Sequence, residues 1–541
     1  MKIFYLLVLT GSLLSTGFVK HHQNTKTDVR KPNILFAIMD DVTYSHMGAY
    51  GCTWVKTPNF DRIARNGLLF KNGYTPNAKC STSRASIITG RNPWQLEEGG
   101  NHISYFPSKF GSFAEVLAQN GYFVGFTGKG IEPLTAKTHD GSPRQMLVNA
   151  FDSIKTIAPT KQISNSDYAA NFQFFLTKRK TGQPFFFWYG GREPHRDYEF
   201  GSGINKGGKK LNDITDKDIF SFWPKTDSIR TDMLDYAFEI EYFDQHLGKM
   251  VKQLEAIGEL NNTLIVVTSD NGMPFPRVKG QEYEYSSHLP LAMMWADGIS
   301  HPGREIEDYI SFIDFAPTFL ELAQVPAGKN FMQPITGKSF TSLFSTDRRR
   351  ISQMRNYVLV GRERNDVGRP GDEGYPIRGI FQNNLLFLKN FEASRWPSGD
   401  PITGYLDTDG SPAKTICLRA VSATGSYFNY WLWNFGKRPG EELYDIKKDP
   451  DCLHNLANDP LYKSNLAELR TKMLNELNRQ EDPRVLGKGY LFDRYEYADK
   501  SGIHFYERYL AKDTSLQWRW VNDGDFQDLS GNKKASTVRN K

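Results

Sequence analysis

The chain is poor in cysteine and has no closely spaced cysteine pairs. Its 541 residues include only Cys52, Cys80, Cys417 and Cys452. Four cysteines in a chain of this length exclude a scaffold held together mainly by disulfide bonds. One hypothesis is that Cys417 and Cys452, which both lie in the C-terminal region, pair with each other.

Long basic runs and clusters of zinc ligands are also missing. The 67 lysines and arginines against 61 acidic residues give a mild net charge of +6. This balance argues against a nucleic-acid-binding protein, but it allows a local cationic site for an acidic substrate. No group of histidines and cysteines has the spacing of a zinc site.

The N-terminus holds the one hydrophobic run that resembles a targeting segment. Lys2 precedes an apolar run from Ile3 to Leu14, and small residues follow it. The run is too short to span a bilayer. The pattern predicts a secretory signal peptide over residues 1–20, no membrane span, and a secreted or periplasmic protein.

Four continuous apolar runs predict strands that are buried on both faces. They are Asn33–Met39, Tyr122–Phe126, Pro184–Tyr189 and Thr263–Thr268. Runs without alternation are typical of a parallel sheet that helices cover on both sides. Helical periodicity appears between them, most clearly from Thr231 to Ile257. Strands that alternate with helices predict a doubly wound α/β domain, here over residues 32–350.

The pattern changes after Asp347. Shorter strand-like runs follow at Tyr357–Val360, Ile377–Phe381 and Leu385–Leu388. They predict a smaller C-terminal α+β domain with a short antiparallel sheet over residues 351–480. Residues 481–541 form a C-terminal extension, rich in aromatic and charged residues, for which the sequence indicates no role.

Polar residues follow the four apolar runs where the predicted strands end. They are Asp40 and Asp41 after the first run, Lys129 after the second, His195 after the third, and Asp270 with Asn271 after the fourth. Because ligands of doubly wound folds bind beyond the carboxyl ends of the strands, we expect these side chains in one site. Three carboxylates and an amide are hard oxygen ligands, suited to Ca²⁺ or Mg²⁺ rather than zinc.

One short motif indicates the chemistry of this site. The segment Cys80–Arg84 reads Cys-Ser-Thr-Ser-Arg, and Thr-Gly-Arg follows at residues 89–91. It resembles the signature of the type I sulfatases, Cys-x-Pro-Ser-Arg followed by Thr-Gly-Arg, with Thr82 where the family usually has proline. The resemblance implies an alkaline phosphatase-like fold. It also implies that a maturation enzyme oxidises Cys80 to formylglycine, whose hydrated aldehyde is the nucleophile.

The same resemblance implies roles for the strand-end residues. The metal ion, Ca²⁺ or Mg²⁺, would be held by Asp40, Asp41, Cys80 in its modified form, Asp270 and Asn271. Arg84 would hold the aldehyde hydrate or the sulfate, and Lys129 and Lys279 would grip the sulfate, with Arg277 as a competitor for the place of Lys279. His195 would protonate the leaving group, a role that suits a side chain titrating near neutrality.

The chain departs from the family just after Lys129. Most members carry a histidine two residues after this lysine, whereas Gly130 and Ile131 follow here. The nucleophile therefore lacks its usual partner. Other histidines could replace it, and the sequence does not choose among His102, His139 and His288.

Within the family the chain looks closest to the heparan N-sulfatase (sulfamidase) branch. The resemblance rests on Ser269–Pro276, Pro194–Arg196 and Tyr375–Arg378. It implies hydrolysis of the N-sulfate of glucosamine in heparin or heparan sulfate. Basic residues of the second domain could contact this acidic sugar, and the candidates are Arg362, Arg364 and Arg378.

Three alternatives remain open at this point. The first is an O-sulfatase that acts on another sulfated glycan, and the second is an inactive sulfatase-like protein that binds glycans. The third is a phosphohydrolase of the alkaline phosphatase-like superfamily, against which the missing zinc-type histidines argue. The sequence gives no oligomeric state.

Overall fold

The computed structural model describes Met1 and residues 30–350 and 355–516. The chain divides into two compact units, Met1–Arg30 and Lys31–Lys541, and the description below concerns the second unit. The predicted signal peptide, apart from Met1, and the end of the C-terminal extension lie outside the described residues.

A seven-stranded sheet forms the centre of this unit, in the order β10-β2-β9-β8-β1-β7-β5. The strands are β1 (Asn33–Met39), β2 (Leu68–Phe70), β5 (Phe123–Gly128), β7 (Phe185–Gly190), β8 (Thr263–Ser269), β9 (Leu291–Met294) and β10 (Arg304–Ile306). The four predicted strands are the adjacent parallel strands β8, β1, β7 and β5. The expected parallel core is thus confirmed, and antiparallel β9 makes the sheet mixed.

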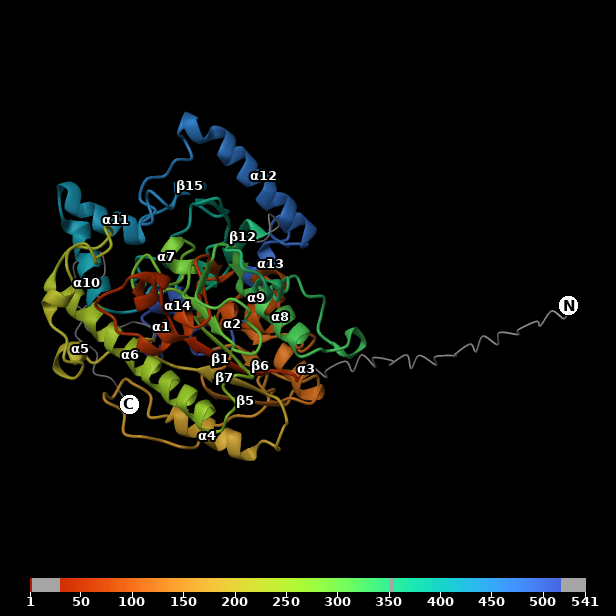
Figure 1. The fold of residues 1–541 in the computed structure, drawn as a ribbon. Coiled ribbons are helices and arrows are strands. Elements are labelled where there is room, and N and C mark those ends of the chain that lie inside the picture. The colour runs from red at the N-terminus through yellow and green to blue at the C-terminus, as the bar shows by residue number, and fades with distance from the viewer. Residues whose placement is uncertain (2–29, 351–354, 517–541) are drawn as a thin grey trace. The chain divides into compact units, whose positions relative to one another are not determined.

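Helices cover both faces of the sheet, which explains the unbroken apolar runs. All seven residues of β1 are buried. Leu35, Ala37 and Met39 join a core cluster with residues of α1 (Pro58–Arg65), α4 (Tyr168–Lys178) and α6 (Asp227–Ala256). The intervening residues of β1 join a second cluster with α2 (Cys80–Thr89), α3 (Phe113–Gln119) and α8 (Phe315–Leu322) (Figure 1). Successive side chains of a strand point to opposite faces, so each face needs its own apolar residues.

Local capping sets where the predicted helices begin and end. The Thr226 hydroxyl accepts a hydrogen bond from the Ile229 amide, so α6 starts at Asp227, four residues before the predicted start. Helix α2 starts at Cys80 and ends before Gly90, whose φ of 66° is the left-handed conformation that favours glycine. Cys80 is therefore the first residue of a helix whose ten residues are all buried.

The second sheet has the order β12-β13-β14-β15 and is antiparallel throughout. Its strands are Tyr357–Arg362, Ile377–Gln382, Leu385–Asn390 and Glu441–Asp445. Helix α12 (Lys463–Arg479) packs on one face through Leu466, Leu469, Met473 and Leu477. The short antiparallel sheet expected after Asp347 is confirmed, with β15 as an additional strand.

The remaining elements are short and lie between or beside the two sheets. The strands are β3 (Gly73–Tyr74), β4 (Tyr105–Phe106), β6 (Thr135–Ala136) and β11 (Ile310–Ser311). The helices are α5 (Ser202–Asn205), α7 (Glu284–Ser287), α9 (Ser342–Ser345), α10 (Pro412–Arg419), α11 (Asn429–Phe435), α13 (Tyr490–Arg494) and α14 (Phe505–Leu510). Among the described residues, no helix has both the length and the apolar character needed to cross a bilayer.

The hypothesis of a disulfide bond in the C-terminal region is wrong. All four cysteines are free thiols. Cys417 is buried in α10 among the apolar residues below the first sheet, whereas Cys452 belongs to a cluster with residues of the second sheet. The two thiols therefore pack into separate parts of the core.

Candidate active site

The polar residues that follow the parallel strands meet at one edge of the first sheet. Asp40 and Asp41 follow β1, Lys129 follows β5, and Asp270 follows β8. At this edge β5 and β7 approach closely. A Cβ on Gly128, whose φ is 77°, would lie 2.0 Å from the Gly190 carbonyl oxygen. Glycine there lets the Lys129 amide donate a 2.7 Å hydrogen bond to this carbonyl, which places the lysine at the edge.

Buried acids form the centre of the edge. The potential ligand atoms of Asp40, Asp41 and Cys80 all lie within 4.8 Å of one another. Asp270 Oδ1 accepts a 3.1 Å hydrogen bond from the Asp41 amide, and Asn271 Nδ2 donates a 2.6 Å bond to Asp41 Oδ1. Four oxygen-bearing side chains thus converge with Cys80, as the sequence predicted from their positions at strand ends.

Burial and mutual repulsion perturb these carboxyl groups. Burial raises the pKa of Asp41 to about 6, although Lys279 opposes the shift, and it raises the pKa of Asp270 to about 7 against the charge of Arg84. For Asp40 burial acts in the same direction, but the charges of Lys129 and other cations hold its pKa well below its usual range. Such a cluster gains stability from additional positive charge.

The donor set fits a hard divalent cation. Asp40 Oδ1 and Asn271 Oδ1 are buried and have no hydrogen-bond partner. Buried polar atoms are normally satisfied, so two unsatisfied oxygens beside the carboxylates of Asp41 and Asp270 suit a missing ligand. Their oxygen chemistry matches Ca²⁺ or Mg²⁺ rather than zinc.

Cys80 lies at the start of α2 and faces a histidine. Its side chain is 2% exposed, and Sγ is 3.5 Å from His102 Nε2. Burial raises the pKa of the thiol, although Lys129 and Lys279 oppose the shift. An unmodified Cys80 is therefore a neutral thiol at neutral pH, which is a poor nucleophile.

Three buried cations surround the acids and Cys80. Arg84 Nε is 2.6 Å from Asp270 Oδ2, and Lys129 Nζ is 2.5 Å from Asp40 Oδ2. Lys279 Nζ is 2.7 Å from an oxygen of Asp41. They come from the middle of α2, a strand end and a loop, and they make this edge suitable for an anion.

Arg277 does not take the place of Lys279. Its Nη1 donates a 2.6 Å hydrogen bond to the Trp433 carbonyl, and its Nη2 donates to the Cys452 carbonyl. The guanidinium therefore serves packing against the C-terminal region. Of the two competitors, Lys279 is the one that reaches the buried acids.

His195 lies on the turn that follows β7. Its Nδ1 is 2.5 Å from the Arg196 carbonyl oxygen, so Nδ1 carries the proton of the neutral ring. Burial, with the positive charges of Lys279 and Lys129, lowers the pKa of His195 to about 4. A bound anion would act in the opposite direction and favour the imidazolium.

Of the three histidines left open by the sequence, His102 is the one beside Cys80. Its Nδ1 is 3.1 Å from Asp366 Oδ1, and Asp366 Oδ2 is 2.8 Å from Lys79 Nζ. His139 instead contacts Ser108 in an exposed loop, and His288 pairs with Glu284. This selection needs a three-dimensional contact across 22 residues, which no local pattern shows.

Two acids of the site escaped the sequence reasoning. Asp366 follows β12, and Asp409 Oδ2 lies 2.9 Å from Lys279 Nζ. Both come from segments after residue 350, in the region predicted as a separate domain. Asp407-Thr-Asp-Gly resembles an ordinary turn in sequence, so only the fold connects Asp409 with Lys279.

The three arginines predicted to contact substrate are buried. Arg362, Arg364 and Arg378 are 1%, 3% and 0% exposed. Arg362 Nε donates to the Tyr375 carbonyl, and Arg364 Nη2 donates to the Tyr495 carbonyl. Arg378 pairs with acids of its own region. These bonds hold the three side chains in the interior, and a contact with a glycan stays a prediction.

A cavity of about 650 Å³ opens beside the strand edge. Asp40, Lys129 and His195 line it together with Ala158, residues 160–165 and Arg192. Its size suits a small polar ligand such as a sugar. Predicted catalytic residues therefore line one part of the cavity, and residues that the sequence did not indicate line the rest.

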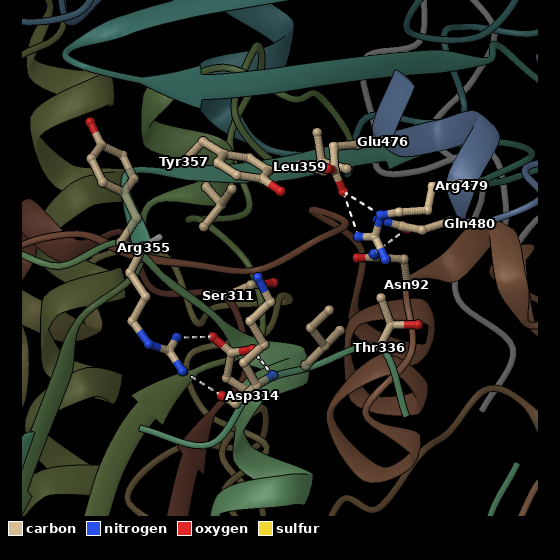
Figure 2. Close-up of a pocket in the computed structure, with 14 residues that line it drawn as sticks. Asn92, Ser311, Asp314, Thr336, Arg355, Tyr357, Leu359, Glu476, Arg479 and Gln480 are labelled. Carbon is tan, nitrogen blue, oxygen red and sulfur yellow. Dashed lines mark hydrogen bonds and ion pairs between the residues drawn. The ribbon is translucent and has the colours of Figure 1, made fainter. Parts of the chain in front are cut away.

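A second, smaller cavity of about 70 Å³ lies between the first sheet region and α12. Figure 2 shows its charged residues joined in pairs, with Arg355 bonded to Asp314 and Arg479 to Glu476. The paired charges and the small volume indicate a structural contact rather than a glycan site.

Known proteins resemble this chain in sequence and in fold. A family model described as Sulfatase matches residues 32–325, more than half of the chain. Human N-sulphoglucosamine sulphohydrolase is 27% identical over 488 residues, which cover 84% of this chain and 92% of the human protein. An ulvan-active sulfatase of Formosa agariphila is 26% identical over 497 residues, which cover 86% of this chain and 78% of that protein.

A solved structure shares the fold. It is a protein in complex with its substrate D-glucosamine-2-N,6-O-disulfate, and it aligns with a TM-score of 0.58 and 21% identity. The alignment covers 84% of this chain and 98% of that one.

Proposed function

The chain belongs to the sulfatase family, and from that premise we propose that it hydrolyses the N-sulfate of glucosamine in heparin or heparan sulfate. The supporting observation concerns the residues of the site. Cys80, three buried cations and four metal-type ligands meet at one sheet edge beside a sugar-sized cavity.

The proposal includes two groups that complete the site. Formylglycine made from Cys80 by a maturation enzyme would supply a hydroxyl nucleophile, and a divalent cation would polarise a sulfate oxygen. Asp40, Asp41, Asp270 and Asn271 would hold the cation, since two of their buried oxygens accept no hydrogen bond. Ca²⁺ is the first candidate and Mg²⁺ the second.

Thr82 is compatible with this reading of the motif. Its hydroxyl donates a 2.6 Å hydrogen bond to Asn77 Oδ1, and it lies in the first turn of α2. Proline is also tolerated in the first turn of a helix. Thr82 therefore satisfies the local geometry where the family usually has proline.

We also propose a role for each remaining residue of the site. Arg84, Lys129 and Lys279 would neutralise the charge that develops on the sulfate, a task worth about 10²–10³ in rate for one donor. His195 would give a proton to the departing nitrogen or oxygen. His102, whose Nδ1 is held by Asp366, would present Nε2 to the side chain at position 80 and accept a hydrogen bond from it.

O-sulfate hydrolysis is the second candidate. The supporting observation is that similar sulfatases act on different sulfate groups, such as the N-acetylglucosamine-6-O-sulfatase of Bacteroides thetaiotaomicron, 26% identical over 394 residues. The buried cations would bind either kind of sulfate. The atom that leaves, nitrogen or oxygen, is the difference to be tested.

The proposal extends to the layout of the chain. We propose a signal peptide over residues 1–20, a catalytic domain over 32–350, an α+β domain over 351–480 and an extension over 481–541. A chain with this signal peptide would be secreted or periplasmic, where it would meet sulfated glycans.

Sulfate release from defined saccharides tests the function. Each saccharide carries one sulfate, at the N-, 2-O-, 3-O- or 6-O-position of a heparin-type unit. Release from the N-sulfated compound is the expected result, and release from O-sulfated compounds alone would contradict the N-sulfatase assignment. Peptide mass spectrometry at Cys80 should show the loss of about 18 Da that accompanies conversion of the thiol to an aldehyde.

A further inference from the structure

The cavity beside the strand edge has a second cationic region away from the buried lysines. Lys161 and Arg192 line it, and both side chains are exposed. Among the described residues, no hydrogen bond or ion pair of either side chain is found, although Arg192 lies close enough to Glu193 to affect its charge. Two exposed cations on one cavity wall would attract a negatively charged group.

Buried Glu193 connects the two segments that carry Lys161 and Arg192. Glu193 Oε1 accepts a 2.8 Å hydrogen bond from the Ser164 amide, which ties residues 158–165 to the turn after β7. Its other oxygen accepts a 2.9 Å bond from the Tyr168 hydroxyl. Arg192 is on the same turn, since its carbonyl accepts a bond from the His195 amide. Lys161 and Arg192 are thereby held near the proposed proton donor.

The acids of the cavity do not cancel these charges. Asp40 pairs with Lys129, and Glu193 uses its oxygens as just described. Glu239 is 1% exposed, and burial raises its pKa well above the usual value, which favours its neutral form. Arg196 is neutralised by Asp232 at 2.7 Å. Among the described residues, neither Lys161 nor Arg192 forms an ion pair with an acid of the cavity.

The cavity also has polar atoms suited to hydroxyl groups. Gln162 Oε1 and Glu239 Oε1 line it or lie just behind its surface, and both are buried without a hydrogen-bond partner. Buried polar atoms without partners are uncommon, and a hydroxyl-rich ligand would satisfy them. This observation is independent of the charges and points to a sugar in the same space.

We propose that Lys161 and Arg192 form an anion subsite for a second negatively charged group of the glycan, a sulfate ester or a carboxylate. The subsite rests on the proposed function, in which the first sulfate lies at Lys129 and His195. It is formed by the catalytic domain, and it replaces the second-domain arginines as the place where an acidic glycan is recognised. The nucleophile and the metal ligands take no part in it.

Binding to a turnover-deficient protein tests the subsite without dependence on catalysis. The full-length Cys80→Ala protein is titrated calorimetrically with three ligands. They are glucosamine-N-sulfate, glucosamine-2-N,6-O-disulfate and a disaccharide in which glucosamine-N-sulfate is linked to a uronic acid. The same titrations are repeated after Lys161→Gln and Arg192→Gln are introduced together, and after Lys252→Gln, an exposed lysine of α6 outside the cavity lining.

The expected result is selective. Loss of charged hydrogen bonds should weaken the disulfate or the disaccharide about tenfold or more, while glucosamine-N-sulfate keeps its affinity within about twofold. Lys252→Gln should change none of the three. Weakening of the disulfate alone identifies a sulfate ester as the second group, and weakening of the disaccharide alone identifies a carboxylate.

Two outcomes would overturn the subsite. One is equal weakening of all three ligands in the double variant, and the other is no weakening of any. Failure of the proposed function has a different signature, because the protein with Cys80 intact would then release no sulfate from glucosamine-N-sulfate whatever the residues at 161 and 192.

Discussion

Two buried groups of charges in this protein differ in whether their polar atoms are satisfied. The strand-edge cluster consists of Asp40, Asp41, Asp270, Arg84, Lys129 and Lys279. The second-sheet cluster consists of Arg378, Glu363, Asp482 and Arg484. Both are almost inaccessible to water, so burial alone does not separate them.

Their hydrogen bonds do separate them. In the strand-edge cluster, Asp40 Oδ1 and Arg84 Nη2 are buried without a hydrogen bond, and they lie 3.9 Å from each other. In the second-sheet cluster, Arg378 donates from Nε, Nη1 and Nη2, and none of the four side chains has a buried atom without a partner. The first arrangement leaves buried polar atoms that a ligand would satisfy, whereas the second satisfies its polar atoms as folded.

The largest expected effect concerns the nucleophile at the strand edge. Cys80→Ala should lower sulfate release by about 10⁴-fold or more, because the proposed nucleophile is removed. The melting temperature should stay close to that of the unchanged protein, since only one small buried atom is lost. Cys52→Ala, at a half-buried cysteine outside the site, is the matched control and should retain activity.

Near-normal sulfate release by Cys80→Ala would contradict the assigned nucleophile. Mass spectrometry of the starting protein is needed beside this measurement, because a protein with an unmodified thiol would be inactive before any substitution.

Breaking the second-sheet cluster should affect stability instead. Arg378→Ala leaves Glu363 and Asp482 buried without their partner, which typically costs about 3–5 kcal/mol of the free energy of unfolding. Urea denaturation measures this loss. The folded fraction of Arg378→Ala should keep its KM for glycans. A raised KM with unchanged stability would identify Arg378 as a substrate contact.

Lys129→Ala should show the opposite pattern. The loss of one charge aimed at the sulfate should lower kcat about 10²–10³-fold, with a smaller loss of stability than Arg378→Ala causes. Kinetics and urea denaturation on the same preparations give both quantities. A loss of stability without a loss of kcat would mean that Lys129 only balances the charge of Asp40.

Removal of the divalent cation should destabilise the strand-edge cluster alone. A metal present at about 100 times its Kd contributes about 2.7 kcal/mol to stability. A chelator should therefore lower the melting temperature and abolish turnover, and Ca²⁺ should restore both. In Asp40→Asn the chelator should have a smaller effect, and an equal effect in both proteins would place the cation elsewhere.

The smallest expected effect tests His195 as a proton donor. His195→Gln should slow hydrolysis of glucosamine-N-sulfate by about 10²-fold and slow an activated aryl sulfate far less, because a good leaving group needs no proton. The pKa of about 4 means that the acid form becomes scarcer as the pH rises, so kcat/KM should fall with increasing pH. Equal slowing of both substrates would assign His195 to binding.

The sequence predicted the strand-edge cluster because its residues follow apolar runs directly. Position along a strand is a local property, and parallel strands bring their ends to one edge. Asp40, Asp270 and Lys129 were located by this rule, and the resemblance to sulfatases added Cys80 and Arg84. The parallel core was predictable for the same reason, since β1 shows its double burial as an unbroken apolar run.

The remaining parts depended on contacts between distant segments. His102 reaches Cys80 through the packing of a loop that has no periodic pattern, and Asp366 reaches His102 from beyond β12. The ion pairs of Arg378 were not predicted, because the sequence of a short strand does not show whether its arginine faces solvent or two buried acids.

The contact between His102 and Asp366 couples activity to local unfolding. Asp366 belongs to the segment after β12, while Cys80 and His102 belong to the chain before it. Proteins open in cooperative pieces with different free energies, and peripheral pieces open first. If the second sheet detaches, His102 loses its carboxylate while the parallel core is still folded. On heating, inactivation should therefore precede the melting of the core. The half-life of activity would then depend on how long the second sheet stays attached, and not on global unfolding.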